Sequence, residues 1–177
     1  EFERELELNS DLLIEVECLK QVKNKLHCLE QFDPPEELVE AVCRVLITVG
    51  GYTKALVSIT GDPFTGGGDP CCITAYINRS SSADGEEVTM TAADPVPGFP
   101  APEDVGAGVH RRGDAVFDAV NKTGAECLAA EKMLAIPLMS GGGPFGVLAI
   151  LAEGGDSFGI RERELMEELG SDLSFGL

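Results

Sequence analysis

The stretch "AIPLMSGGGPFGVLAILAEGGDSF", residues 135–158, contains two short apolar runs separated by a cluster of glycines. Gly141, Gly143 and Gly146 stand in the order G-x-G-x-x-G, which is also found in loops that bind dinucleotides. Such a loop needs a strand before it and a helix after it, so that the helix N-terminus faces the pyrophosphate. Here both flanking runs have the length and the β-former content of strands. The stretch therefore predicts a β-hairpin with a glycine-rich turn, and its glycines imply no nucleotide.

The composition of the whole chain limits its class. With 177 residues, of which 44% are hydrophobic, the chain is expected to form one compact domain plus an extension. A net charge of −18 repels nucleic acid and anionic membrane surfaces, so neither is an expected partner. We find no run of about 20 apolar residues and no secretory leader. We therefore expect a cytoplasmic location and no membrane contact by this segment.

Cysteine and histidine are placed in a way that does not favour a metal site. The six cysteines include no C-x-x-C pair, and the two histidines are His27 and His110. In a core-rich chain without a leader, dispersed cysteines favour reduced thiols over disulfides. Cys43 is expected in the core, and a redox role for Cys71, Cys72 or Cys127 stays open.

Residues 1–31 form the predicted extension. No Gly or Pro occurs between about residues 3 and 31, and apolar residues recur at heptad spacing, with one exception at Glu15. A helix of roughly 28 residues would be about 42 Å long, too long for one small domain to cover. Its stripe either pairs with a second copy in a homodimer or packs in part on its own domain. The proposed dimer interface consists of Leu12, Leu19, Val22, Leu26 and Leu29.

The remaining chain alternates between helical and strand patterns. Residues 33–51 predict a helix with Asp33 as N-cap and glycines at its end, and residues 157–177 predict a closing amphipathic helix. The expected buried face of the first helix comprises Leu38, Val42, Cys43, Leu46 and Val49, and that of the closing helix Ile160, Leu165, Met166, Leu169 and Leu173.

Strands are expected within residues 52–61, 71–79 and 87–93, besides the two strands of the hairpin. The proline-rich residues 94–104 suit neither a helix nor a central strand. Between them and the hairpin we expect a short helix at 105–114, a short strand at 115–120 and a helical turn at 124–132. This order predicts an α+β sandwich with helices at one face of an antiparallel sheet.

Two segments carry a resemblance to a known family. "AIPLMSGGGPFGVLAILAEGGDSFGIRERELMEELGSDLSFGL" resembles the C-terminal half of a GAF domain, with its Ile-Pro-Leu strand, glycine turn, Gly-Val-Leu strand and Phe before the last helix. "LVEAVCRVLITVGGYTKALVSI" is similar to the opening of GAF domains that follow PAS domains and precede histidine kinase or cyclic-dinucleotide output modules. The resemblance implies a GAF domain at residues 32–177, preceded by a signalling or coiled-coil helix at 1–31.

The family resemblance also implies an architecture and a ligand pocket. It implies a central antiparallel sheet of five or six strands, with the N- and C-terminal helices on one face and short helices or loops over the other. GAF domains bind cyclic nucleotides, haem, bilins and other small molecules between the sheet and the connections that cover it. Carried to this chain, the pocket wall would comprise Tyr76, Phe99, Val109, His110, Phe117, Cys127 and Met133.

The cofactor remains unknown from the sequence. The chain lacks the Cys-His dipeptide of bilin attachment and the N-K-x-n-F-x3-D-E signature of phosphodiesterase GAF domains. His110 is a conceivable axial haem ligand, although a lone histidine is more often not a ligand. A catalytic pair of Cys127 and His110 would need an orienting third group, and no residue can be named for it. No catalytic or metal-binding residue is therefore expected.

Two functions stay open at this point. The first is a non-catalytic sensory or regulatory domain that binds a small molecule and relays the signal through its terminal helices to neighbouring domains of a longer chain. The second is a structural dimerisation module without a ligand, which transmits signals between its neighbours.

Overall fold

The computed structural model describes residues 35–59, 73–82, 85–92, 101–124, 126–154 and 158–176, with backbone alone for 35–36, 73–82 and 85–92. The expected N-terminal helix at 1–31 and its proposed dimer interface lie outside these residues, as do Phe99, Cys71 and Cys72. Within the described ranges, no helix combines the length and the apolar composition needed to cross a membrane.

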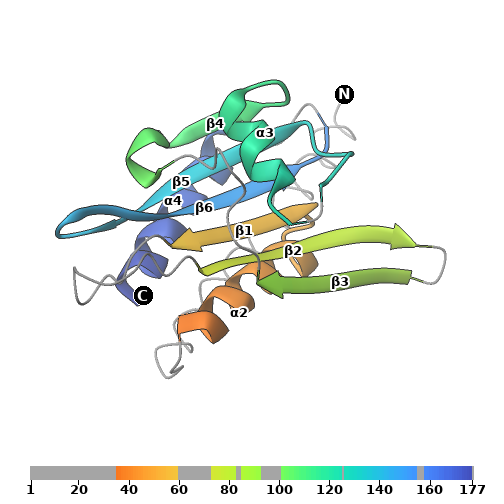
Figure 1. Ribbon diagram of the computed structural model, residues 1–177, viewed down its shortest axis with the longest axis horizontal. Coiled ribbons are helices and arrows are strands. Elements are labelled where there is room, and N and C mark those ends of the chain that lie inside the picture. Colours follow the sequence, from red (N-terminus) through yellow and green to blue (C-terminus); the bar gives the residue numbers. More distant parts are fainter. Residues whose placement is uncertain are drawn as a thin grey trace, which may run out of the picture.

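The strands form one antiparallel sheet in the order β3-β2-β1-β6-β5-β4 (Figure 1). The first and last strands of the described residues meet at the centre of this sheet, because β1 pairs with β6. The strands are β1 Lys54–Ile59, β2 Ile73–Ser82, β3 Gly85–Ala92, β4 Gly108–Arg111, β5 Lys132–Ser140 and β6 Gly143–Ala152. The helices are α2 Pro35–Thr48, α3 Ala115–Lys122 and α4 Ile160–Gly176, with a 3₁₀ turn η1 at Pro102–Asp104. The predicted α+β class is confirmed.

The glycine cluster turns the chain between β5 and β6, as the sequence predicted. Ser140 pairs with Gly143, so only Gly141 and Gly142 lie between the two strands. Gly143 has a φ of 119°, a conformation that residues with a Cβ rarely adopt. The dinucleotide interpretation is thereby excluded for this motif, because no helix follows its glycines.

One detail of the hairpin differs from the sequence expectation. Strict alternation from Val147 would place Phe145 on the same face as Val147. The register shifts beside Leu138 and Met139, which pair with Gly146 and Pro144 and leave Phe145 without an opposite residue. Phe145 consequently packs in the same cluster as Leu148, on the other face. A β-bulge re-aims a side chain in this way, and sequence alternation alone does not reveal it.

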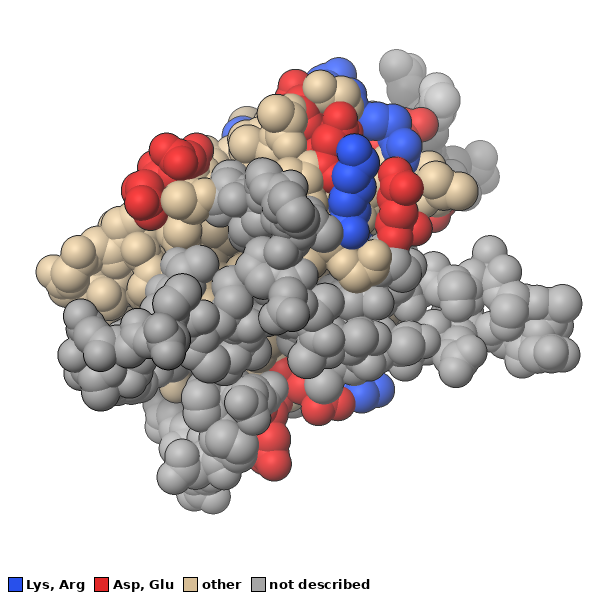
Figure 2. All heavy atoms as spheres, viewed as in Figure 1, with Lys and Arg blue, Asp and Glu red and all other residues tan. Residues whose placement is uncertain are grey.

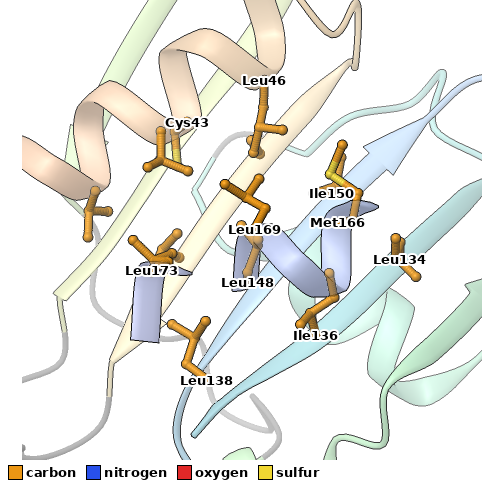
Figure 3. Close-up of a cluster of buried hydrophobic side chains, with 14 of the residues drawn as sticks. Cys43, Leu46, Leu134, Ile136, Leu138, Leu148, Ile150, Met166, Leu169 and Leu173 are labelled. Carbon is orange, nitrogen blue, oxygen red and sulfur yellow. The ribbon is translucent and has the colours of Figure 1, made fainter. Parts of the chain in front are cut away.

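The two faces of the sheet carry separate apolar layers. Helices α2 and α4 cover one face, which we call the helix face, and α3 lies over the other (Figure 1). Figure 3 shows side chains of α2 and α4 in one apolar layer with side chains of β5 and β6. The residues labelled in this helix-face cluster are Cys43, Leu46, Leu134, Ile136, Leu138, Leu148, Ile150, Met166, Leu169 and Leu173.

Helix α4 approaches β5 closely at Gly170. A Cβ on Gly170 would lie 2.6 Å from Cγ2 of Ile136, so a larger residue would push the helix away from the strand. Met166, Leu169 and Leu173 are buried as expected. Ile160 is 70% exposed, contrary to expectation, because it is the first residue of the helix and the preceding Phe158 occupies the core position.

The segment between residues 105 and 132 corrects three expectations. Residues 108–111 of the expected short helix form strand β4, whose hydrogen bonds come from its partner β5. The expected strand at 115–120 is part of helix α3, which buries Phe117 and Val120 on one side. The described residues of the expected helical turn at 124–132 contain no helix, and β5 begins at Lys132. In all three cases tertiary contacts outweigh a weak local signal.

The charged surface around α3 and β4 mixes both signs. Figure 2 shows lysine and arginine side chains next to acidic ones at the end of the molecule that carries these elements. Interspersed charges of this kind are typical of a solvated protein surface.

Leu148→Asp tests the placement of β6. Leu148 is fully buried between the central strands and the helices, so an aspartate there would be a buried charge without a partner. We expect the free energy of unfolding to fall by roughly 3 to 5 kcal/mol. Urea denaturation measures this loss. Leu128→Asp is the matched control because Leu128 is 79% exposed, and its effect should stay within about 0.5 kcal/mol. Equal effects of the two substitutions would contradict the core assignment.

Candidate functional site on the α3 side of the sheet

The α3 side of β1, β6 and β5 is closed by a second apolar layer. Phe117 and Val120 descend from α3, Cys127 and Ala130 come from the loop that follows, and Val105 comes from the turn after η1. They pack onto strand residues Leu56, Met133, Ala135, Val147, Ala149 and Leu151. A buried apolar layer therefore covers this part of the sheet.

The layer unites several of the residues expected to line a pocket. Phe117, Cys127 and Met133 belong to this one cluster. His110 lies directly opposite Met133 in the β4–β5 register, on the same face. The Nε2 atom of His110 is buried and has no hydrogen-bond partner among the described residues.

The other expected wall residues are placed differently. Val109 is opposite Leu134, which belongs to the helix-face cluster, so Val109 lies on the face away from α3. Tyr76 occupies the register position opposite Leu56, and its side chain lies outside the description. The strand register therefore places position 76 on the α3 side of the sheet and Val109 on the helix face.

A buried lysine connects the central strand to the end of α3. Lys54 is fully buried, and its Nζ donates to the carbonyl oxygens of Asn121 at 2.8 Å and Thr123 at 2.7 Å. The last carbonyls of a helix lack intrahelical partners and carry partial negative charge, so a cation is favoured there. Lys54 therefore caps the C-terminus of α3 from below.

Burial lowers the pKa of Lys54 from 10.5 to about 8, because desolvation penalises its charged form. The neighbouring Cys127 and Glu126 act in the opposite direction and raise this pKa. The Lys54 amine therefore stays protonated at pH 7, and burying its charge lowers the free energy of unfolding. This penalty decreases as the pH rises and the amine loses its proton.

An amide and a guanidinium hold the loop after α3. Asn121 Nδ2 donates to the carbonyl of Cys127 at 3.2 Å, and Asn121 Oδ1 accepts from the Cys127 N–H at 3.1 Å. Arg112 donates to the carbonyls of Leu128 at 2.7 Å and Ala130 at 3.0 Å, and its guanidinium lies 5.8 Å from the centre of the Phe117 ring. We call residues 112–131 the α3 cap.

Sequence reasoning did not identify Lys54, Asn121 or Arg112. Lys54 is the one charged residue in the run "KALVSI", and a charge in an otherwise uncharged strand could have been noticed from the sequence. Asn121 and Arg112 bond to backbone atoms that are brought close only by folding, so no sequence motif marks them. Among the described residues, no three His, Cys, Asp or Glu side chains gather closely enough to hold a metal ion.

A groove also opens on the helix face, between α4 and β5. Its volume is about 380 Å³. Two of its wall residues are strongly exposed, Met139 at 52% and Phe175 at 91%. The groove is lined by Ala107, Ile136, Pro137, Met139, Glu167, Ser171, Ser174 and Phe175.

The pH dependence of stability tests the environment of Lys54. Because the folded-state pKa is about 8 and the ordinary value is 10.5, the unfolded chain binds more protons between these values. The contribution of Lys54 to stability should therefore rise from pH 8 to pH 10.5. We expect Lys54→Met to flatten this part of the curve measured by urea denaturation. The exposed Lys122 gives the control Lys122→Met, which should keep the wild-type slope, and a wild-type slope in Lys54→Met would contradict the burial of the amine.

Comparison with known proteins identifies the fold. No protein-family model and no curated protein matches the sequence. The structure is similar to the GAF domain of a phosphoenolpyruvate-protein phosphotransferase from Coxiella burnetii, with a TM-score of 0.56, 15% identity, and coverage of 93% of this chain and 92% of that one. The GAF domain of a putative sensor histidine kinase from Pseudomonas syringae pv. tomato gives 0.54 and 16%, covering 96% and 91%. Free methionine-R-sulfoxide reductase from Neisseria meningitidis, in complex with its substrate, gives 0.53 and 15%, covering 92% and 87%. The chain therefore has the fold of a GAF domain, as the resemblance of its sequence predicted.

Proposed function

We propose that this chain is a non-catalytic sensory or regulatory GAF domain of a cytoplasmic signalling protein. In this proposal it binds a small molecule on the α3 side of the sheet and relays the event through its terminal helices to neighbouring domains. The fold supports the proposal, since it is also the fold of a putative sensor histidine kinase domain. The mixed-sign surface and the acidic net charge fit a partner other than nucleic acid.

The observation that carries the binding proposal is the buried Nε2 of His110. A buried polar atom normally has a hydrogen-bond partner, and leaving one unpaired costs about 1 to 3 kcal/mol. A ligand that offers a donor or an acceptor at this position would remove that cost. We therefore propose that His110, Phe117, Cys127 and Met133 line the binding site. Tyr76 and Phe99 are retained in this proposal from the sequence prediction.

Binding without catalysis is the function that the cysteine environment favours. Cys127 is buried, and both of its backbone polar groups are held by Asn121. A catalytic thiol is usually a partly exposed thiolate with an activating base beside it. The similar methionine sulfoxide reductase is an enzyme, so the fold itself is compatible with catalysis, and our proposal depends on the site and not on the fold.

A dimerisation module without a ligand is the second candidate, and the end of α4 favours it. Phe175 and Met139 expose large apolar surfaces beside the α4–β5 groove. Exposed apolar patches mark contact sites when they are contiguous. In both candidates we propose a homodimer through Leu12, Leu19, Val22, Leu26 and Leu29.

Native mass spectrometry with an absorbance scan tests the binding proposal. We expect the purified wild-type domain to carry a non-covalent mass adduct, and His110→Ala to lose it. Val109→Ala is the matched control, because Val109 is adjacent in the chain and lies on the opposite face. A wild-type mass equal to that of the bare chain would favour the dimerisation module, and retention of the adduct by His110→Ala would remove His110 from the site.

Analytical ultracentrifugation tests the proposed dimer. We expect the wild type to sediment as a dimer at tens of micromolar and Leu26→Asp to sediment as a monomer, since a charge at a heptad core position opposes pairing. Asn24→Asp adds the same charge at a position that is not one of the apolar core positions of the heptad, and it should leave the dimer intact. A monomeric wild type would contradict the dimer proposal.

A further inference from the structure

Three consecutive residues connect the α3 cap to the beginning of α4. Tyr52, Thr53 and Lys54 lie at the entry to β1, and we call them the 52–54 bridge. Tyr52 donates its hydroxyl proton to Oε1 of Glu162 in the first turn of α4. Its ring stacks on Phe158, with the ring centres 5.9 Å apart and the planes 12° from parallel. One end of the bridge is therefore bonded to the start of the last helix.

Glu162 organises the N-terminus of α4. While its Oε1 accepts from Tyr52, its Oε2 accepts the backbone N–H groups of Phe158 and Gly159, the latter at 3.2 Å. Phe158 has a φ of 68°, which is uncommon for a residue with a side chain. Such a conformation persists when the surroundings determine it from several sides. Here those determinants are the Tyr52 ring and the Glu162 carboxylate.

The other end of the bridge is bonded to the α3 cap. Lys54 donates to the carbonyls of Asn121 and Thr123, as described above. Between the two ends, Thr53 bonds to the carbonyl of Leu151 on β6 through its backbone N–H at 3.0 Å and its hydroxyl at 2.9 Å. A chain rises at most about 3.4 Å per residue, so the two ends are about 7 Å apart along the backbone. So short a segment, fixed at its middle, leaves little room for its ends to move independently.

We infer that the 52–54 bridge sets the position of the α4 N-terminus according to the position of the α3 cap, with Tyr52 and Lys54 as positioning residues. The inference rests on the proposed function in one respect, namely that the α3 cap lies on the ligand side and α4 leads to the output. A change of cap position moves the carbonyls that hold Lys54. The same change reaches the Tyr52 hydroxyl and ring, and through them the Glu162 carboxylate that caps α4. This gives the two sites a contiguous physical connection, whose strength a double-mutant cycle measures.

The test is amide hydrogen exchange by NMR on the wild type, Tyr52→Phe, Lys54→Met and the double variant. Tyr52→Phe should speed exchange at Phe158 and Gly159 roughly tenfold, since it releases one oxygen of the capping carboxylate. Lys54→Met should speed the same two amides roughly threefold, although its bonds run to the α3 cap. In the double variant, exchange at these two amides should speed up by clearly less than the product of the two single-variant factors. Lys54→Gln, which keeps a shorter donor, serves as a second variant and should change the same amides in the same direction.

Ser174→Ala supplies the matched control cycle. The Ser174 hydroxyl oxygen accepts the Met139 N–H at the far end of α4, outside the bridge. When Ser174→Ala is combined with Lys54→Met, the change in the exchange rate of Met139 should equal the product of the changes in the two single variants. The inference is overturned if Lys54→Met leaves the exchange rates of Phe158 and Gly159 unchanged. It is also overturned if the effects of Tyr52→Phe and Lys54→Met multiply as fully as the effects in the control cycle. No ligand enters this measurement, so its failure rejects the bridge and leaves the binding proposal to the mass-adduct experiment.

Discussion

Strands β1 and β6 are buried on both faces, and the rest of the structure depends on this constraint. Every residue of β1 is buried, as are the last eight of β6. A strand of this kind needs an apolar cover on each side, because exposing either face would return its side chains to water. Helices α2 and α4 supply one cover, and α3 with its following loop supplies the other. The three-layer arrangement follows from the need to bury these two strands.

Lys54 is a charged residue within the buried strand β1, and its hydrogen bonds explain the form of the α3 cap. A buried ammonium must be paired or hydrogen-bonded, and Lys54 donates to the carbonyls at the end of α3. That arrangement places the end of α3 above the beginning of β1. Two residues earlier, Tyr52 contacts the first turn of α4. Lys54, which holds the end of α3 on one side of the sheet, is thus only two residues from Tyr52, which contacts helix α4 on the opposite side.

Local patterns predicted the elements whose identity depends on neighbouring residues. The glycine turn with its two apolar runs became β5 and β6, and the amphipathic pattern after Phe158 became α4. Prediction failed between residues 105 and 132, where the backbone finds its partners far away. Strand β4 exists because β5 lies beside it, and the loop after α3 is held by Arg112 and Asn121 instead of by bonds within a helix. Short segments of this kind carry too few residues for their own propensities to decide their structure.

The sequence by itself determined the α+β class, the hairpin, the helices α2 and α4, the acidic net charge and the resemblance to GAF domains, because each depends on spacing and composition. Only the tertiary structure decided which side of the sheet each candidate residue occupies. It placed His110 beside Met133 and moved Val109 to the other face, since the side-chain direction in a strand depends on register. It also decided that Lys54 is buried beneath α3 and that Ile160 is exposed. Register and burial depend on residues distant in the chain, and no local pattern records them.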